Sequence, residues 1–269
     1  MTEPYSKRLA LAVEERGRLC VGIDPHPSLV SAWGHTPDAA GAESFARGLI
    51  EAIGSRVAVF KPQSALFEAY GSPGVAVLER VLRSCREAGA LVILDAKRGD
   101  FQPTMQGYAR AYLMADSPFA ADALTVSPYL GVGSLQPAFD AAAESGRGLY
   151  VLARTSNPEG GIVQLASTGE GTSVAQQVAD DVQVRNDVVG PEFGLVVGGT
   201  HDDLGLDLAR FTGSVLVPGL GAQGATMADI DRRFAGTGAS LLPTTSRQVA
   251  GAGPDAAALC EAVDRLLAG

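Results

Sequence analysis

The sequence predicts an α/β protein in which eight strand-then-helix units close into a (β/α)8 TIM barrel, preceded by an N-terminal helix. Two observations support this fold. Short apolar runs rich in β-branched residues recur at regular intervals along the 269 residues, and amphipathic stretches with helical periodicity separate them. The runs are almost continuously apolar, as expected for parallel strands covered by helices. We expect a single domain over residues 1–269, because no shift in composition marks a linker.

The expected strands end at charged, glycine or proline residues, where an apolar run can no longer continue. In chain order they cover residues 19–24, 57–62, 91–97, 123–128, 149–154, 194–199, 214–218 and 239–243. The start of the chain runs into a helix-like stretch, and the later helices are expected at residues 44–53, 75–88, 105–113, 133–144, 174–188, 202–211, 226–234 and 255–267. Residues 155–172 are rich in Gly and Ser, and we interpret them as a mobile loop at the active site.

An open, doubly wound sheet is the competing fold for such a series of units. The first strand lacks the Gly-x-Gly-x-x-Gly turn that a dinucleotide-binding sheet of this type carries. A closed barrel is therefore the simpler prediction.

Composition narrows the class of protein. Hydrophobic residues make up 46% of the chain and aromatic residues 6%, which indicates an aliphatic core. No apolar run approaches the roughly 20 residues of a membrane span, and the first residues lack the apolar core and cleavage site of a signal peptide. The cysteines Cys20, Cys85 and Cys260 are widely spaced and odd in number, so they predict neither disulfides nor a zinc site. We expect a cytoplasmic protein.

The net charge of −9 argues against nucleic acid or an anionic membrane as a partner, because no basic stripe is present. If the substrate is an anion, the cations that bind it must be concentrated locally against this overall charge.

The segment Asp95-Ala96-Lys97-Arg98-Gly99-Asp100 is the most informative stretch of the chain. It follows the apolar run 90–94, and side chains two apart on a strand point to the same face. Asp95 and Lys97 should therefore project together from the carboxyl end of the strand, with Asp100 in the loop beyond. One isolated Asp-x-Lys pair would be explained as well by a structural ion pair.

Other charged residues end the first two expected strands, and together with Asp95 and Lys97 they argue against a purely structural ion pair. Asp24 ends the first expected strand and Lys61 lies at the end of the second. In a TIM barrel the carboxyl ends of the strands meet at one mouth, where catalysis takes place. Four ionisable groups of alternating sign would converge there, and partly buried ions are costly unless they are paired. An active site gains a preorganised electric field from such an array, whereas a fold gains little.

The loops after the seventh and eighth expected strands predict a phosphate site, the usual place for one in this fold. The seventh runs into Pro218-Gly219-Leu220-Gly221-Ala222-Gln223-Gly224, and its glycines, Gly219, Gly221 and Gly224, allow backbone N–H groups to converge on an anion. The eighth runs into Thr244-Thr245-Ser246-Arg247, where Arg247 supplies a forked cationic donor. We place Pro218, Ser246 and Arg247 among the substrate-binding residues.

Histidines and cysteines do not form a ligand set in this sequence. His26, His35 and His201 lack the spacing of a metal site, and no Ser-His-Asp or Cys-His pattern is evident. We expect neither a metal nor an organic cofactor.

Six segments together resemble the orotidine 5′-phosphate decarboxylase family, in the bacterial branch whose central motif is Asp-x-Lys-Arg-Gly-Asp. The matching segments, which span nearly the whole chain, are Val21-Gly22-Ile23-Asp24-Pro25, Phe60-Lys61-Pro62-Gln63, Leu94-Asp95-Ala96-Lys97-Arg98-Gly99-Asp100, Thr125-Val126-Ser127-Pro128-Tyr129-Leu130-Gly131, Arg154-Thr155-Ser156-Asn157-Pro158 and Pro218-Gly219-Leu220-Gly221-Ala222-Gln223-Gly224. Each segment is moderately specific alone, and their order on one barrel makes the resemblance strong.

The resemblance implies a reaction and its catalytic residues. Orotidine 5′-phosphate would lose CO2 to give uridine 5′-phosphate (UMP), in pyrimidine biosynthesis. Asp95 would lie against the substrate carboxylate, and Lys97 would protonate C6 of the pyrimidine as CO2 leaves. Lys61 would hold Asp95 and a ribose hydroxyl.

The resemblance also implies the substrate-binding residues. Asp24 would bind the ribose, Ser156 the pyrimidine edge, and Gln223 and Arg247 the phosphate. Asp100 and Thr104 would reach across the interface of a homodimer into the partner's site. The sequence departs from the family pattern between them, at Phe101-Gln102-Pro103, which leaves the Asp-to-Thr spacing intact but alters the local backbone.

Two other functions stay open at this point. A metal-dependent sugar-phosphate aldolase or decarboxylase on the same barrel also carries an Asp-x-Lys-x-x-Asp strand, with carboxylates holding a divalent cation. Lys61 would crowd that cation, and the second strand supplies no acidic ligand. A non-catalytic phosphate-binding barrel would need the phosphate loop but neither Asp95 nor Lys97.

Overall fold

Eight parallel strands form a closed barrel in the computed structural model, which describes residues 3–169, 171–221 and 224–268. The strands are β1 (Cys20–Ile23), β2 (Val59–Pro62), β3 (Leu91–Arg98), β4 (Ala123–Val126), β5 (Gly148–Arg154), β6 (Phe193–Val197), β7 (Ser214–Pro218) and β8 (Ser240–Thr245). They are hydrogen-bonded in chain order, and β8 pairs with β1 through Cys20 and Val21. This pairing closes the barrel and excludes the open sheet. Every expected strand is present, with bounds that differ by no more than two residues.

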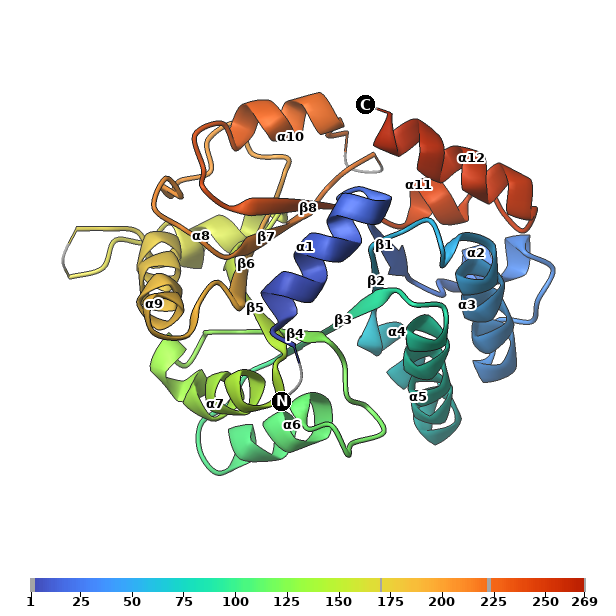
Figure 1. Cartoon of the computed structure of the whole chain (residues 1–269), viewed down its shortest axis with the longest axis horizontal. Helices are drawn as coiled ribbons and strands as arrows, with labels where there is room; N and C mark the ends of the chain where they lie inside the picture. Colours follow the sequence, from blue (N-terminus) through green and yellow to red (C-terminus); the bar gives the residue numbers. More distant parts are fainter. Residues whose placement is uncertain (1–2, 170, 222–223, 269) are drawn as a thin grey trace.

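Helices surround the barrel and cover its outer face (Figure 1). They are α1 (Tyr5–Arg16), α2 (Pro27–Ala32), α3 (Ala39–Ile53), α4 (Ser64–Glu68), α5 (Gly71–Glu87), α6 (Thr104–Leu113), η1 (Val132–Leu135), α7 (Gln136–Ser145), η2 (Pro158–Gly160), α8 (Gly161–Gln164), α9 (Val174–Val189), α10 (Met227–Arg233), α11 (Arg247–Ala250) and α12 (Ala256–Leu267). Several begin at side-chain caps that the sequence supplies: Asp38, Ser173, Thr226 and Asp255 each accept a hydrogen bond from a backbone N–H in the first turn.

The helix expected at residues 202–211 was wrong. The whole connection from β6 to β7, residues 198–213, is described and contains turns and bends but no helix. Its aspartates bond to the backbone instead: Asp203 accepts from the N–H of Gly205, and Asp207 accepts from the N–H of Ala209. Short polar side chains compete with helical hydrogen bonds in this way, and Gly205 has a positive φ of 69°.

Strand alternation divides the core into two layers. Residues pointing outward, such as Val21, Phe60 and Leu94, pack against the helices in one large cluster. Residues pointing inward form the cluster that fills the barrel: Cys20, Val59, Ile93, Ala123, Tyr150, Val196, Leu216 and Leu242. The next inward positions toward the carboxyl ends include Lys61, Asp95 and Thr125, so the interior changes from apolar to polar along the barrel axis.

Helix α1 lies across the amino-terminal end of the barrel (Figure 1). Tyr5 is buried against the interior cluster, and its hydroxyl is 2.9 Å from the hydroxyl of Tyr150. A side chain at Gly148 would clash with the Tyr5 ring, since its Cβ would lie 2.4 Å from Cδ1. Ser6 donates to Glu192, and Arg8 pairs with Asp122, which fixes the helix to two loops. The expected N-terminal helix is thus confirmed, and the structure adds that α1 closes this end of the barrel, as a plug.

The expected loop at residues 155–172 contains more structure than its composition indicated. It includes η2 and α8, and an antiparallel bridge joins Ser167 to Ser173. Glu170 lies outside the described residues. Across the described part of the chain, no helix combines the length and the apolar character that crossing a membrane would require.

The α1 plug generates the first prediction. Tyr5→Phe should lower the free energy of unfolding by about 1 kcal/mol, because one buried hydrogen bond is lost. Tyr5→Ala should lower it by about 3–5 kcal/mol, because it also leaves a cavity. Urea denaturation followed by circular dichroism measures both. Leu11→Ala on the exposed side of the same helix is the control, and an equal loss there would contradict the plug.

Candidate functional site

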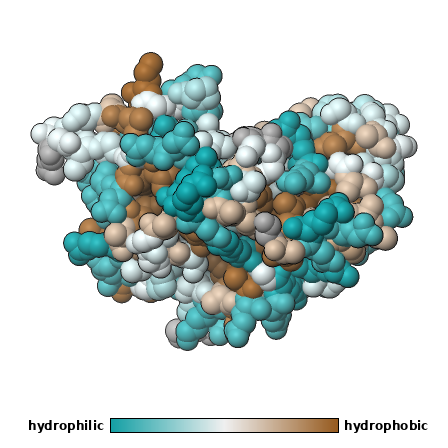
Figure 2. Space-filling view, turned by 90° about the horizontal axis from the view of Figure 1, so that it is seen from above, coloured by the Kyte–Doolittle hydropathy of each residue, from teal (hydrophilic) through white to brown (hydrophobic). Residues whose placement is uncertain are grey.

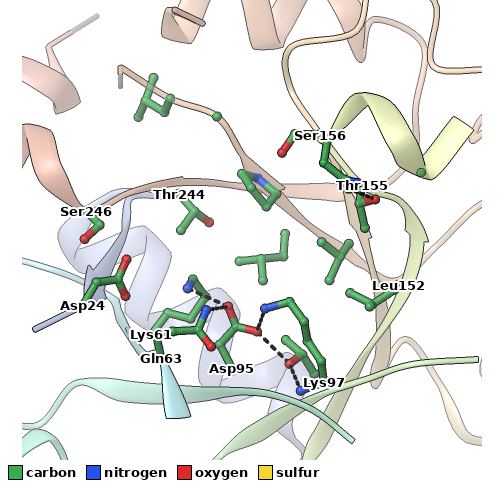
Figure 3. Close-up of a pocket in the computed structure, with 18 of the residues that line it drawn as sticks. Asp24, Lys61, Gln63, Asp95, Lys97, Leu152, Thr155, Ser156, Thr244 and Ser246 are labelled. Atoms are coloured by element: carbon green, nitrogen blue, oxygen red, sulfur yellow. Dashed lines mark hydrogen bonds and ion pairs between the residues drawn. The ribbon is translucent and has the colours of Figure 1, made fainter. Parts of the chain in front are cut away.

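A cavity of about 860 Å³ opens at the carboxyl ends of the strands. Figure 3 shows its arrangement: Lys61, Gln63, Asp95 and Lys97 lie together at the floor, Asp24 and Ser246 at one side, and Thr155 and Ser156 across from them. The strand ends therefore bring to one place the charged groups that the sequence predicted would converge.

Asp95 lies at the centre of the polar side chains on the cavity floor and hydrogen-bonds to four of them. Its carboxylate accepts hydrogen bonds at Oδ2 from Lys61 Nζ and Gln63 Nε2, both at 2.9 Å. Its Oδ1 accepts from Lys97 Nζ at 2.6 Å and from the Thr125 hydroxyl at 2.9 Å. Two cationic and two neutral donors thus fix the position of one carboxylate.

Burial and charge act in opposite directions on these groups. Asp95 and Lys61 are each only 6% exposed. Burial alone would raise the pKa of the Asp95 carboxyl, but the charges and hydrogen bonds of Lys61 and Lys97 outweigh it and hold that pKa well below its usual range. Burial alone would lower the pKa of Lys61, yet the charges of Asp95 and Asp24 raise it. Both groups are therefore ionised at neutral pH.

Lys97 differs from Lys61 in its exposure. Its side chain is 45% exposed and lines the cavity, whereas that of Lys61 is 8% exposed. The Lys97 ammonium is thus anchored to Asp95 on one side and open to a ligand on the other.

The wall formed by β1 and β8 carries polar atoms without partners. Within the described part of the chain, Asp24 Oδ1, Thr245 Oγ1 and Ser246 Oγ are buried and accept or donate no hydrogen bond. Gly22 lies beneath this group, and a Cβ there would be 2.8 Å from the Cβ of Ser246 and 3.2 Å from Asp24 Oδ2. Buried polar atoms are normally paired, so this wall is suited to a ligand rich in hydroxyl groups.

The opposite wall belongs to β5 and the segment that follows it. Thr155, Ser156 and Asn157 line the cavity, as does Gln164 of α8. The Gln164 side chain accepts from the N–H of Thr155 at 3.0 Å and donates to its hydroxyl at 2.7 Å. These bonds hold α8 against the mouth of the cavity.

Part of the lining between the two walls is apolar. Leu152, Val196 and Leu216 point into the cavity from β5, β6 and β7. Figure 3 labels Leu152 beside Lys97. Apolar walls keep the local dielectric low and strengthen the field of the neighbouring charges.

The expected phosphate-binding residues divide between two places. Pro218, Gly219 and Arg247 line the main cavity together with Ser246. Gly221 and Gly224 line a neighbouring hollow of about 440 Å³ beside α12, and their N–H groups donate to Ala225 and Gly221 within the loop itself. Gly219, Gly221 and Gly224 all have positive φ values, which glycine tolerates. Gln223 lies outside the described residues.

Asp100 and Thr104 do not line the cavity of their own chain. Asp100 is half-buried and accepts from the N–H of Phe101, while Thr104 is exposed at the start of α6. Asp100 lies in the loop after β3, whose carboxyl end is at the mouth of the cavity, and Thr104 begins the helix that follows this loop.

Gln63 and Thr125 belong to the group of side chains around Asp95, although the sequence did not predict a role for either. Both bond directly to Asp95. Each had a recognisable signal: Thr125 is a hydroxyl residue within the apolar run of β4, and Gln63 directly follows Lys61-Pro62 at the end of β2. Their importance depends on register across strands, which the sequence does not display.

Histidine, cysteine and carboxylate side chains do not gather in groups of three or more that could hold a metal ion among the described residues. His26 lines the cavity, and His201 Nε2 lies 2.8 Å from the carbonyl oxygen of Thr155. All three cysteines are free thiols.

Comparison with known proteins gives a consistent result. The family model described as "Orotidine 5'-phosphate decarboxylase / HUMPS family" matches residues 17–262. A curated orotidine 5′-phosphate decarboxylase of Salinispora arenicola is 55% identical over 268 residues, which cover 99% of this chain and 96% of the relative. The corresponding protein of Streptomyces coelicolor is 53% identical over 265 residues, covering 98% and 95%.

Solved structures show the same similarity. A crystal structure of a Streptomyces avermitilis protein has a TM-score of 0.95 and 52% identity, covering 99% of this chain and 94% of the other. The structure of Leishmania donovani OMP decarboxylase has a TM-score of 0.76 and 30% identity, covering 99% of each chain.

The group of side chains around Asp95 generates a prediction about stability and pH. At pH 7, Asp95→Asn should lower the free energy of unfolding by about 3–5 kcal/mol, because the buried Lys61 ammonium loses its partner. Folding lowers the pKa of Asp95, so its contribution is complete above the unfolded carboxyl pKa of about 3.9 and is lost as the pH falls further. The difference between wild type and variant should therefore shrink below about pH 4.

Urea titrations at several pH values measure this difference. Glu43→Gln, which breaks the surface pair with Arg80, is the control and should cost at most about 1 kcal/mol. A destabilisation by Asp95→Asn that is the same at pH 3 as at pH 7 would show that the carboxylate is not held ionised by its partners.

Proposed function

The chain belongs to the orotidine 5′-phosphate decarboxylase / HUMPS family, and we propose that the Lys61–Asp95–Lys97 array on the cavity floor carries out its reaction. The enzyme is a carboxy-lyase of pyrimidine biosynthesis that converts orotidine 5′-phosphate to UMP and CO2. The observation that carries the mechanism is that one ionised carboxylate and one accessible ammonium are held side by side in the cavity.

The chemistry demands stabilisation of a localised charge. When the bond between C6 and the carboxyl carbon breaks, CO2 leaves and the electron pair stays on C6, with no adjacent electron sink. The Lys97 ammonium then donates a proton to C6 and forms the C–H bond of UMP. Solvent reprotonates the lysine after product release.

Lys97 acts on the charge that develops at C6, and Asp95 acts on the carboxylate that leaves as CO2. The ammonium of Lys97 attracts the charge that develops on C6, and at about 4 Å this is worth on the order of 4 kcal/mol at an effective dielectric of 20. The ionised Asp95 repels the substrate carboxylate and favours its departure as neutral CO2. Leu152, Val196 and Leu216 exclude water and strengthen both effects.

These charges do not account for the whole acceleration, since enzymes lower barriers by about 8–23 kcal/mol. The remainder comes from the parts of the substrate that do not react. We assign the ribose to Asp24 and the β1–β8 wall, whose buried polar atoms have no partner among the described residues, and the pyrimidine edge to Ser156. We assign the phosphate to Arg247, Gln223 and the loop after β7.

Ribose and pyrimidine sites on opposite walls fit one nucleotide. Figure 3 shows Asp24 and Ser246 across the cavity from Ser156, with Lys97 between the two walls. A nucleotide lying across the floor places its C6 over the Lys97 ammonium. Residues 155–172 carry Gln164 and part of the pyrimidine wall, and we propose that this segment is the lid.

The metal-dependent aldolase is disfavoured by the donor set. Both oxygens of Asp95 already accept two hydrogen bonds each, and two of the four donors are cations. A divalent cation would have to displace these donors and would meet the charge of Lys61.

We propose that the enzyme is a homodimer in which Asp100 and Thr104 complete the partner's site. Both follow β3 and lie outside the cavity of their own chain. The neighbouring loops expose large apolar side chains, with Phe101 65%, Leu130 52% and Tyr129 81% exposed, as expected of a surface that a second copy covers. Figure 2 shows one face of the molecule, on which hydrophobic and hydrophilic residues are mixed and whose upper edge is hollowed.

We also propose a cytoplasmic location. The three free thiols, Cys20, Cys85 and Cys260, suit a reducing compartment.

The first test of the mechanism is the ultraviolet absorbance of orotidine 5′-phosphate during turnover, with and without a chelator. We expect turnover that is insensitive to the chelator. Lys97→Ala should reduce kcat by more than about 1,000-fold and leave UMP affinity within about threefold, because the ammonium acts mainly in the transition state.

The exposed Lys7→Ala is the matched control and should turn over as the wild type does. Inhibition by the chelator would mean that the carboxylates hold a metal. Substantial turnover by Lys97→Ala would show that another group protonates C6.

The dimer generates a complementation test. Asp100→Ala and Lys97→Ala should each be nearly inactive alone. In a heterodimer, one site receives Lys97 from one protomer and Asp100 from its partner, and is intact. Random exchange of subunits should therefore restore about one quarter of wild-type activity, since half of the dimers are mixed and half of their sites are whole. No recovery in a mixture shown to exchange subunits would place Asp100 in the site of its own chain.

A further inference from the structure

We propose that Thr125 is a positioning residue for the reaction: its hydroxyl fixes both the backbone of Lys97 and the carboxylate of Asp95, and so sets where the reacting ammonium lies. This inference rests on the proposed function, because it assigns Thr125 a role only through Lys97 and Asp95. It is carried by two hydrogen bonds and by the irregular pairing of β3 with β4.

The pairing of β3 and β4 is interrupted at the catalytic segment. Leu94 is opposite Leu124, and the next pair joins Arg98 to Val126. Three residues of β3, Asp95 to Lys97, therefore face the single residue Thr125. Such a bulge leaves backbone groups without their usual ladder partners and redirects the side chains that it contains.

The bulge places Lys97 in an unusual backbone conformation. Its φ is +49°, and among the described residues it is the one non-glycine residue with a positive φ. L-residues avoid this region because Cβ crowds the backbone, so the conformation persists only where its surroundings hold it. The intrinsic backbone preference of a lysine does not stabilise this positive φ, so a contact from the surrounding structure must do so.

Thr125 provides this contact. Its Oγ1 accepts a hydrogen bond from the backbone N–H of Lys97 at 3.0 Å, in place of a ladder carbonyl. The same hydroxyl donates its proton to Asp95 Oδ1 at 2.9 Å. One side chain thus bonds to the residue that delivers the proton and to the carboxylate that anchors its ammonium.

Thr125 is itself rigidly placed. It is 1% exposed within β4, and a β-branched side chain on a strand has few alternative rotamers. Its hydroxyl has one proton, which is directed to Asp95 because the N–H of Lys97 occupies an acceptor lone pair. Lys61 and Gln63 bond only to the other oxygen of Asp95, so they do not replace this link to Lys97.

Removing the hydroxyl should therefore affect the chemical step more than ligand binding. Thr125→Val keeps the shape of the side chain and loses both hydrogen bonds. Since a displacement of about 1 Å at a reacting group costs about 100-fold in rate, we expect kcat to fall by about 10- to 100-fold. KM and the affinity for UMP should stay within about twofold, because Thr125 is not assigned to the ribose, the pyrimidine edge or the phosphate.

Two further measurements separate positioning from a general structural role. Exchange of the C6 hydrogen of UMP for deuterium, followed by NMR in D2O, needs proton transfer between C6 and Lys97 but no CO2. It should fall in parallel with kcat in Thr125→Val. Thr125→Ser, which restores the hydroxyl, should recover most of both rates.

Ser214→Ala is the matched control. It removes another buried barrel hydroxyl, which lies 2.7 Å from the hydroxyl of Tyr150 at the opposite end of the barrel. It should alter stability without changing kcat or exchange. If Thr125→Val does not fold, Thr125→Cys, whose thiol bonds weakly, is measured in the same way.

The outcomes distinguish this inference from the proposed function. A wild type without turnover refutes the proposed function. With an active wild type, the role of Thr125 is overturned if kcat of the Val or Cys variant stays within about twofold of wild type. It is also overturned if UMP affinity falls as much as kcat, or if Thr125→Ser recovers neither rate.

Discussion

The structure depends on the neutralisation of one buried carboxylate. Asp95 lies in the barrel interior, where an unpaired charge would cost several kcal/mol. Its four donors come from β2 or the residue after it, from β3 and from β4: Lys61, Gln63, Lys97 and Thr125. Only the register of these neighbouring strands brings them to the same two oxygens. The position of the Lys97 ammonium, and with it the chemistry, follows from satisfying this carboxylate.

The barrel separates stability from catalysis along its axis. At the amino-terminal end, α1 and the interior cluster form an apolar core in which the buried hydroxyl of Tyr5 finds a partner in Tyr150. At the carboxyl end, the fold keeps Lys97 at a positive φ and leaves buried polar atoms on Asp24 and Ser246 without partners in the described chain. The strained backbone and the unpaired polar atoms each lower the stability of the fold. The well-packed amino-terminal end compensates for this loss, so the carboxyl end can keep groups that are available to a ligand.

Much of the site could be predicted because a parallel barrel gathers the carboxyl ends of its strands. The convergence of Asp24, Lys61, Asp95 and Lys97 followed from strand periodicity and closure, and all four line one cavity. The prediction of a helix at residues 202–211 was wrong, because apolar periodicity does not reveal that Asp203 and Asp207 bond to the backbone of their own loop. The phosphate contacts and the dimer stay predictions, since they involve a ligand and a second chain.

By itself the sequence determined the barrel, the order of its strands and the identity of the charged residues at its mouth. Continuous apolar runs for the strands, helical periodicity between them and the charged residues that end several runs are all local features of the chain. The tertiary structure decided the contacts between strands. The three-against-one bulge opposite Thr125, the positive φ of Lys97 and the sharing of Asp95 among four donors exist only when β2, β3 and β4 are in register. Register is a property of paired strands, so no single segment of the sequence contains it.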